Sequence, residues 1–437
     1  MNEWRETEIG ILPKDWNTTK LALIAKANKG LVDGPFGSNL PASEYTDSGV
    51  PVIRGVNLSL GEERFFDDGF VFVSENFAKN LKRSICVPGD IIFTKKGTIG
   101  QIGIIPYNSR YKEYLLSSNQ MKLSVDEEKV DLNFVYYYLS SSRSIKRIRK
   151  DSEYTGVPKI NLTYLKGVVI PLPNLDEQKE IGRILFSIDQ KITLLQSQNQ
   201  ILEKIAQTLF KHWFIDFEFP NAEGKPYRSS GGKMVGSEFG EVPKDWKVND
   251  VYELIEVDYG FPFKSQFFNE TRDGLPLIRI RDLKKGDGSF YTTEEFDQRY
   301  IIQPGDVLAG MDAEFKPYLW SGTKALLNQR VCRFRPKNNN ISKLFLYELV
   351  KPHLHFYEKT KAGTTVIHLG KSDIDQFEII QPKEKILLKY KQITDPLLRK
   401  YINNNKEIRT LTKTRDTLLP KLMSGQIRIS DATKAEL

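Results

Sequence analysis

An internal repeat constrains the fold of this chain more than any other feature of its sequence. The segment Gly10–Trp16 (GILPKDW) returns as Gly240–Trp246 (GEVPKDW). Further landmarks return in the same order, as Val50–Arg54 with Leu275–Arg279, Pro88–Ile92 with Pro304–Leu308, and Asn119-Gln120 with Asn328-Gln329. Ordered matches at a slowly shrinking offset indicate a tandem duplication with a shorter second copy. We therefore expect the two copies to fold alike.

Both copies show the same order of local patterns. Short β-type runs broken by Gly and Pro come first, a helical stretch follows, and a final apolar run precedes a long helix. The predicted strands of copy one are Val50–Ile53, Val87–Phe93, Ile102–Ile105 and Met121–Val125. The predicted helical stretches are Leu132–Lys150 and Ser342–Lys361, and the final apolar runs are Gly167–Leu172 and Phe377–Ile380. This order predicts a mixed α+β fold with short helices in each copy.

The two long helices carry heptad patterns. Apolar residues within Ile181–Trp213 alternate four and three apart, and a less apolar series runs through Leu387–Leu422. Such spacing is typical of coiled coils, so we expect two antiparallel helices that act as a spacer of about 50 Å. Asn199 and Asn404 fall on the seams, where a polar residue fixes register; alternatively, each faces solvent at a seam edge. Pro396 predicts a kink or a late start of the second helix.

These patterns define the predicted domain organisation. Asn174, with Glu177 three residues later, resembles a capping box at the start of the first long helix. The segment before the second copy is rich in Asn, Gly, Ser, Lys and Pro, as linkers are. The predicted parts are a first α+β domain (1–173), a central long helix (174–219), a linker (220–236), a second α+β domain (237–382), a distal long helix (383–425) and a C-terminal tail (426–437).

Composition limits the class of protein. The net charge of +8 permits a nucleic-acid partner without requiring one. No run approaches the roughly 20 apolar residues of a membrane helix, and the polar residues 1–8 resemble neither a signal nor a transit peptide. Two cysteines, Cys86 and Cys332, cannot form a disulfide framework for a chain of this length. We therefore expect a cytoplasmic protein without a membrane partner.

The sequence contains no recognisable catalytic or metal-binding motif. Gly370-Lys371-Ser372 resembles the end of a phosphate-binding loop, but Thr365 stands where its first glycine should be. The Asn/Asp-Pro-Pro-aromatic signature of amino-methyltransferases is absent because the chain has no Pro-Pro dipeptide. The four histidines lack the spacing of a zinc site. We therefore predict no active site and no metal.

DNA recognition requires basic groups for phosphates and amide groups for base edges, and both copies supply them. The candidates in copy one are Lys95, Lys96 and Thr98 in one turn, Asn119 and Gln120 in another, Arg143, Lys146, Arg147 and Lys150 on the helical stretch, and Thr155 and Lys159 after it. The candidates in copy two are Arg279, Arg281, Lys284, Asn328, Gln329, Arg330, Lys359, Lys361, Thr364 and Thr365.

Each of these candidates also has a simpler interpretation. A basic helical face is commonly just a solvated surface. The Asn-Gln pair shared by the copies can be structural, because a common feature cannot by itself separate two sequences. By the same logic, specificity should lie where the copies differ most, at residues 94–103 and 309–320. We expect Trp16 and Trp246 to be packing anchors.

Several segments resemble the specificity (S) subunit of type I restriction–modification systems. The resemblance covers essentially the whole chain and is carried by the Pro-Lys-Asp-Trp opening of each half, the Pro-Gly-Asp strands, Ile170–Ile181, Phe210–Phe217 and Leu418–Ile427. It implies two target-recognition domains separated by two antiparallel coiled-coil helices. Each domain would read one half of a bipartite DNA site, and the helices would set the unread spacer.

The same resemblance implies a noncatalytic subunit. Its partners would be double-stranded DNA, two adenine-methylating modification subunits and the motor-nuclease restriction subunits. AdoMet, ATP and Mg would belong to those partner subunits, so no cofactor is expected on this chain.

Two other classes of function stay open at this point. One is a coiled-coil structural scaffold whose repeats bind protein or glycan, which the modest net charge would allow. The other is a self-contained methyltransferase or nuclease with divergent motifs. A steep loss of DNA binding with salt would argue against the first, and only activity of the purified chain alone would support the second.

Overall fold

The computed structural model describes residues 3–152, 158–361 and 367–429. The chain divides into two compact units. Unit 1 contains Met1–Gln190 together with Leu411–Leu437, and unit 2 contains Lys191–Thr410. Each unit therefore holds one copy of the repeat and part of both long helices, and the C-terminal end of the chain belongs to the unit of the first copy.

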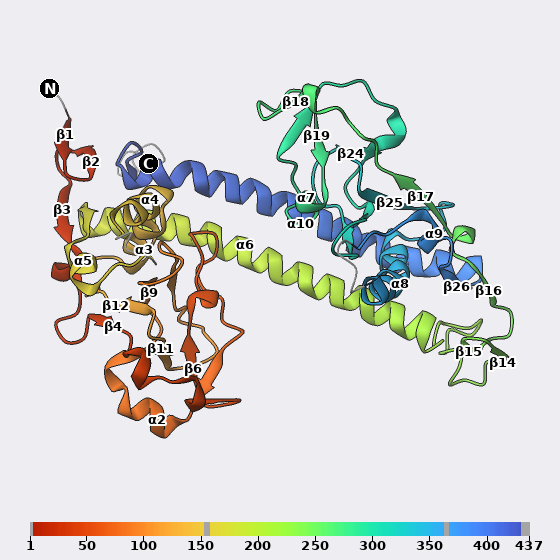
Figure 1. Cartoon of the computed structure of the whole chain (residues 1–437), viewed down its shortest axis with the longest axis horizontal. Helices are drawn as coiled ribbons and strands as arrows, with labels where there is room; N and C mark the ends of the chain where they lie inside the picture. The colour runs from red at the N-terminus through yellow and green to blue at the C-terminus, as the bar shows by residue number, and fades with distance from the viewer. Residues whose placement is uncertain (1–2, 153–157, 362–366, 430–437) are drawn as a thin grey trace. The chain divides into compact units, whose positions relative to one another are not determined.

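Unit 1 is built on two small sheets (Figure 1). The four-stranded sheet has the order β10–β9–β12–β4, with every pair antiparallel. The five-stranded sheet has the order β5–β7–β6–β11–β8, in which β11 runs parallel to β6. The strands are β4 (Leu31–Asp33), β5 (Tyr45–Thr46), β6 (Val50–Ile53), β7 (Val71–Val73), β8 (Ile85–Cys86), β9 (Ile91–Thr94), β10 (Ile102–Ile104), β11 (Tyr114–Leu116) and β12 (Gln120–Leu123). Two further ladders pair β1 (Trp4–Thr7) with β2 (Gly10–Pro13), and β3 (Asn17–Lys20) with β13 (Val169–Leu172).

Unit 2 repeats this topology. Its four-stranded sheet has the order β17–β25–β22–β23, and its five-stranded sheet has the order β18–β20–β19–β24–β21 with β24 parallel to β19. The strands are β17 (Ile255–Tyr259), β18 (Phe268–Asn269), β19 (Leu275–Ile278), β20 (Phe290–Thr292), β21 (Ile301–Ile302), β22 (Val307–Gly310), β23 (Pro317–Leu319), β24 (Ala325–Leu327) and β25 (Val331–Pro336). Two further ladders pair β14 (Met234–Ser237) with β15 (Gly240–Pro243), and β16 (Lys247–Asp250) with β26 (Glu378–Gln381). The duplication predicted from the sequence is therefore present in the strand order.

The short helices differ from the prediction at one point. The stretch Leu132–Lys150 was expected as one helix, but it forms α3 (Leu132–Ser140) and α4 (Ser142–Asp151). Ser141 breaks it because its backbone is extended, and its hydroxyl accepts a hydrogen bond from the Ser144 amide at 3.3 Å as an N-cap. The other helices are α1 (Leu21–Ile24), α2 (Glu75–Asn80), α5 (Leu162–Gly167), α7 (Ile280–Leu283), α8 (Lys343–Lys361) and α9 (Lys371–Ile374).

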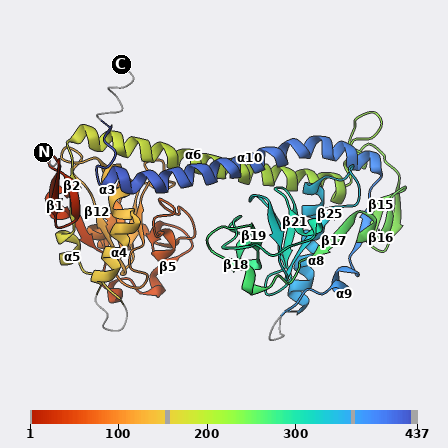
Figure 2. The same ribbon diagram turned by 90° about the horizontal axis from the view of Figure 1, so that it is seen from above.

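The two long helices are α6 (Leu175–Phe210) and α10 (Glu384–Met423). Helix α10 begins before Pro396 and continues through it, so the expected late start is wrong. In unit 2, the C-terminal part of α6 lies beside the N-terminal part of α10 in both views (Figures 1 and 2). The Tyr390 hydroxyl donates to the Ala206 carbonyl at 3.3 Å, and the Asn404 amide donates to Asn199 Oδ1 at 2.9 Å. Since the later residue of α10 meets the earlier residue of α6, the helices run antiparallel.

The two tryptophans of the repeat, Trp16 and Trp246, pack beside the ends of α6 within their units. Trp16 is fully buried and donates its indole N–H to Glu177 at 3.0 Å. Asn174 caps α6 as expected, but Glu177 does not complete the capping box because its carboxylate binds Trp16 and Arg428 instead. In unit 2, Trp246 stacks on Phe219, which follows α6. Both tryptophans are packing anchors, as predicted.

A buried ion pair joins the two central strands of each four-stranded sheet. Asp90 lies just before β9, and its Oδ2 accepts from the Val87 amide at 3.0 Å and pairs with Lys122 of β12 at 2.8 Å. Both side chains of this pair are less than one-tenth exposed. The Pro-Gly-Asp motif therefore forms a turn in which the Asp90 carboxylate accepts a hydrogen bond from the backbone of the same turn and pairs with the buried ammonium of Lys122.

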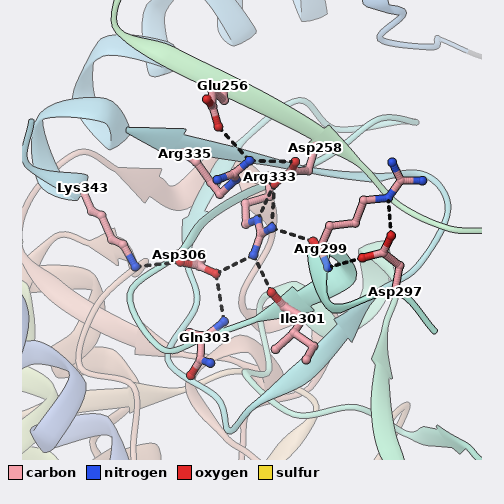
Figure 3. A network of polar contacts seen from close by, with 10 residues as sticks. All are labelled: Glu256, Asp258, Asp297, Arg299, Ile301, Gln303, Asp306, Arg333, Arg335 and Lys343. Carbon is pink, nitrogen blue, oxygen red and sulfur yellow. Dashed lines mark hydrogen bonds and ion pairs between the residues drawn. The ribbon is translucent and has the colours of Figure 1, made fainter. Parts of the chain in front are cut away.

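The equivalent pair in unit 2 belongs to a larger network (Figure 3). Asp306 accepts from the Gln303 amide and pairs with Arg333 of β25 at 3.3 Å. The Arg333 guanidinium also donates to Asp258 at 2.6 Å and to the Arg299 carbonyl at 2.7 Å. Burial raises the pKa of Asp258, but hydrogen bonds from Arg335 and Arg333 outweigh it and hold that pKa below its usual value. The Asp258 carboxylate therefore stays ionised and pairs with both Arg333 and Arg335.

We predict that Asp90→Ala destabilises unit 1 by about 3–5 kcal/mol, because it leaves the Lys122 ammonium buried without its carboxylate. Asp306→Ala should cost unit 2 less, since Arg333 keeps Asp258. Hydrogen exchange of the β9, β12, β22 and β25 amides measures each unit separately.

The matched control removes both charges. Asp90→Ala combined with Lys122→Met should recover most of the lost protection, because an apolar replacement of a whole buried pair is close to neutral. Equal loss of protection in the single and double variants would contradict a role for the ion pair.

Candidate nucleic-acid interface

Three of the segments predicted from copy one meet at one place. The Lys95 amide donates to the Asn119 carbonyl at 2.8 Å, which brings the turn after β9 against the turn before β12. Lys96 forms an isolated antiparallel bridge with Lys159, and the Ile160 amide donates to the Lys95 carbonyl at 2.9 Å. Residues far apart in the sequence therefore share one surface, which we call the copy-one turn cluster (Lys95–Thr98, Ser117–Gln120 and Lys159).

A hollow of about 440 Å³ opens within this cluster. Its lining combines cations, hydroxyls and amides, which are the groups that bind phosphates and base edges. The lining residues are Tyr45, Arg54, Gly55, Val56, Thr94, Lys96, Thr98, Gln101, Ser117, Ser118, Asn119 and Gln120.

The side chains of the cluster have different roles. Lys96, Thr98 and Asn119 are exposed. Lys95 pairs with Asp33 at 3.2 Å, so its charge is partly compensated. Gln120 is buried and its carbonyl oxygen accepts from the Ser117 hydroxyl. Of the predicted amide pair, Asn119 is therefore available to a ligand while Gln120 holds the turn.

The basic helix α4 contributes both exposed and structural cations. Arg143 donates to the Ile9 carbonyl at 2.8 Å and so ties α4 to the N-terminal segment. Lys146, Arg147 and Lys150 are exposed, with Asp151 at 3.9 Å from Arg147. Thr155 lies outside the described residues.

Copy two builds the equivalent cluster from different side chains, which we call the copy-two turn cluster (Asp312, Asn328–Arg330 and His368). Asp312 and His368 form an isolated antiparallel backbone bridge, and the Met311 amide donates to the Arg330 carbonyl at 2.9 Å. Asn328 is buried and accepts from the Gln329 amide, while Gln329 and Arg330 are exposed. The expected match of Asn119-Gln120 with Asn328-Gln329 is wrong by two residues, because Arg330 makes the backbone contact that Asn119 makes in copy one.

The other candidates in copy two are spread over several elements. Arg279 pairs with Asp282 at 3.1 Å and covers the Phe290 ring, and Lys361 binds Asp373 and the His368 carbonyl. Arg281 lies on α7, Lys284 directly follows it and Lys359 lies on α8; all three are exposed. Thr364 and Thr365 lie outside the described residues.

Two arginines were missed by the sequence analysis. Arg54 lines the copy-one hollow, and the repeat pairs it with Arg279, so the repeat alignment could have identified it. The guanidinium groups of Arg54 and Arg279 each have one buried nitrogen without a hydrogen-bond partner. Arg149 donates to the Ile99 carbonyl at 2.9 Å and fixes α4 beside the first turn. Nothing in the local sequence distinguishes Arg149 from the other cations of α4, which are exposed as it is.

Asn199 and Asn404 are buried on the helix seam. Asn404 also approaches Gln198 at 3.3 Å, and its own carbonyl oxygen has no partner. Their role in fixing register stays a prediction.

The part of the chain that the structure describes contains no group of three or more His, Cys, Asp or Glu residues arranged to hold a metal ion. No helix within residues 3–152, 158–361 or 367–429 is long and apolar enough to cross a membrane.

Comparison with known proteins identifies sequence relatives that match nearly the whole chain. The type I restriction enzyme MjaIX specificity subunit of Methanocaldococcus jannaschii is 29% identical over 98% of this chain and 97% of its own length. The MjaVIII specificity subunit of the same organism is 24% identical, covering 96% and 95%. The crystal structure of the type I restriction–modification S subunit from M. genitalium shares the fold, with a TM-score of 0.59 and 17% identity over 93% of this chain and 96% of that chain.

A family model also matches each copy. The model described as the type I restriction modification DNA specificity domain matches residues 13–204 and 243–413, which include both turn clusters. These two matches cover most of the chain. The chain therefore belongs to the family of type I restriction–modification specificity subunits, whose members are noncatalytic.

Proposed function

We propose that this chain reads a bipartite DNA site, with each copy of the repeat contacting one half. The observation that carries this proposal is the duplicated turn cluster on a duplicated sheet. In both copies the turn after β9 or β22 meets the turn before β12 or β25. Two equivalent surfaces on one chain suit a ligand with two separate recognition elements.

The chemistry of the clusters supports DNA as that ligand. The exposed Lys146, Arg147 and Lys150 can contact phosphates, which position a protein without specifying sequence. Asn119 and Lys96 lie at the hollow, where an amide can pair with adenine and an ammonium with guanine.

We further propose that α6 and α10 set the unread spacer between the half-sites. Their antiparallel packing and the Asn199–Asn404 contact support a fixed register, since a buried polar pair penalises sliding of one helix along the other.

The proposed partners supply all the chemistry. Two adenine-methylating modification subunits would dock on this chain, and motor-nuclease restriction subunits would join them in the cytoplasm. AdoMet, ATP and Mg would be bound by those subunits.

A single substitution in copy one should affect one half-site only. We expect Lys96→Ala to weaken binding of the complex with its modification subunits by about tenfold and to relax base preference in one half of the motif. Selection of bound sequences from a random DNA pool measures both halves at once.

Lys166→Ala, an exposed lysine on α5, is the matched control and should leave both halves unchanged. Equal relaxation of both halves by Lys96→Ala would reject the assignment of one half-site to each copy.

A heptad insertion tests the spacer. Seven residues inserted into both α6 and α10 beside Asn199 and Asn404 preserve the seam and lengthen the pair by about 10 Å, or about 3 base pairs. We expect a correspondingly longer spacer or loss of binding. The same seven residues inserted after Gly224, whose surroundings are open, should change nothing. An unchanged spacer in the helix variant would rule out the helices as a ruler.

A further inference from the structure

The same backbone bridge closes both turn clusters. Lys96 pairs with Lys159 in copy one, and Asp312 pairs with His368 in copy two. These positions are equivalent, because the Pro-Gly-Asp motif places Lys96 with Asp312. The ladders that follow, β13 with β3 and β26 with β16, place Lys159 with His368 at the offset that relates β13 to β26. The bridged pairs therefore occupy equivalent places.

The backbone of the turn is also equivalent. Gly97, which follows Lys96, has a φ of 99°, and Ala313, which follows Asp312, has a φ of 68°. Both residues are in the left-handed region, which is unfavourable for an alanine. Copy two thus keeps the turn conformation of copy one even where its sequence disfavours it. What changes between the copies is the chemistry of the side chains.

The charges at the bridge are opposite. Copy one presents two exposed lysines. Copy two presents the Asp312 carboxylate, which lies 2.7 Å from His368 Nδ1 and 3.7 Å from Arg330 Nε. The side chains of Asp312, Arg330 and His368 are 27%, 57% and 43% exposed, so a ligand can reach them.

A purely structural role does not explain the acid. The bridge forms in copy one between two residues of like charge, so an acid–base pair is not required to hold it. Buried ion pairs beneath each turn already fix the strands. A partly exposed carboxylate also faces repulsion from DNA phosphates, which the adjacent Arg330 offsets.

We propose that the bridged pair is the specificity-determining position of each copy, and that its opposite charge makes the two copies read opposite kinds of base edge. This inference rests on the proposed function. The exposed Lys96 ammonium fits an edge rich in acceptors, such as guanine O6 and N7. Asp312, held by Arg330 and His368, fits an exocyclic amino group, such as cytosine N4 or adenine N6.

The test uses Asp312→Asn in the full chain with its modification subunits. The substitution keeps the shape but replaces an acceptor-only group with one that also donates. We expect the preference for an amino-bearing base at one position of one half-site to fall roughly 10- to 100-fold, with the other half unchanged. Asp375→Asn, an exposed acid paired with Lys371 elsewhere in copy two, should leave the selected motif intact.

A second variant guards against misfolding of the first. Lys96→Asp places an acid at the equivalent exposed position of copy one, and it should shift that half-site towards an amino-bearing base. If the wild-type chain selects no split motif, the proposed function itself fails. If the wild type selects a split motif but Asp312→Asn and Lys96→Asp both keep its base preferences, this inference alone is overturned.

Discussion

A buried carboxylate paired with a base on the neighbouring strand holds the polar turns of each copy in place. Asp90 stands at the entrance to β9, whose other end leads into the Lys96 turn, and its partner Lys122 lies on β12, which starts at the Asn-Gln turn. Asp306 and Arg333 do the same for β22 and β25. Breaking such a pair is costly because an unpaired charge would stay buried. In each copy, the ion pair between the two strands therefore fixes the turn that follows the first strand relative to the turn that precedes the second.

This arrangement separates stability from recognition. The pair below the turns is ionic in both copies, whereas the exposed bridge above it carries two lysines in one copy and an acid with a histidine in the other. Side chains at the bridge can change without loss of the scaffold. A protein that must recognise two different half-sites with one duplicated fold needs this freedom.

Much of the fold could be predicted from the sequence, because repeats and heptads are local patterns that side-chain burial enforces. The helix break at Ser141 was missed because a capping hydroxyl outweighed the apolar period of the flanking residues. The site was predicted only in part. Asn119, Lys96 and Lys159 were identified by their chemistry, but the contacts of the Lys95-Lys96 turn with Asn119 and with Lys159 depend on long-range pairing that no local pattern encodes. Asp312 was included only within a variable segment, since an acid is not an expected feature of a DNA-binding surface.

The central claim is that the two copies read two separate half-sites. The most direct test is to co-express the chain with an adenine methyltransferase subunit of its own system and to sequence the host genome for N6-methyladenine. We predict a split motif, two short specific sequences separated by an unread spacer, that is methylated only when this chain is present. A continuous motif, or no new methylation from a complex shown to assemble, would contradict the account.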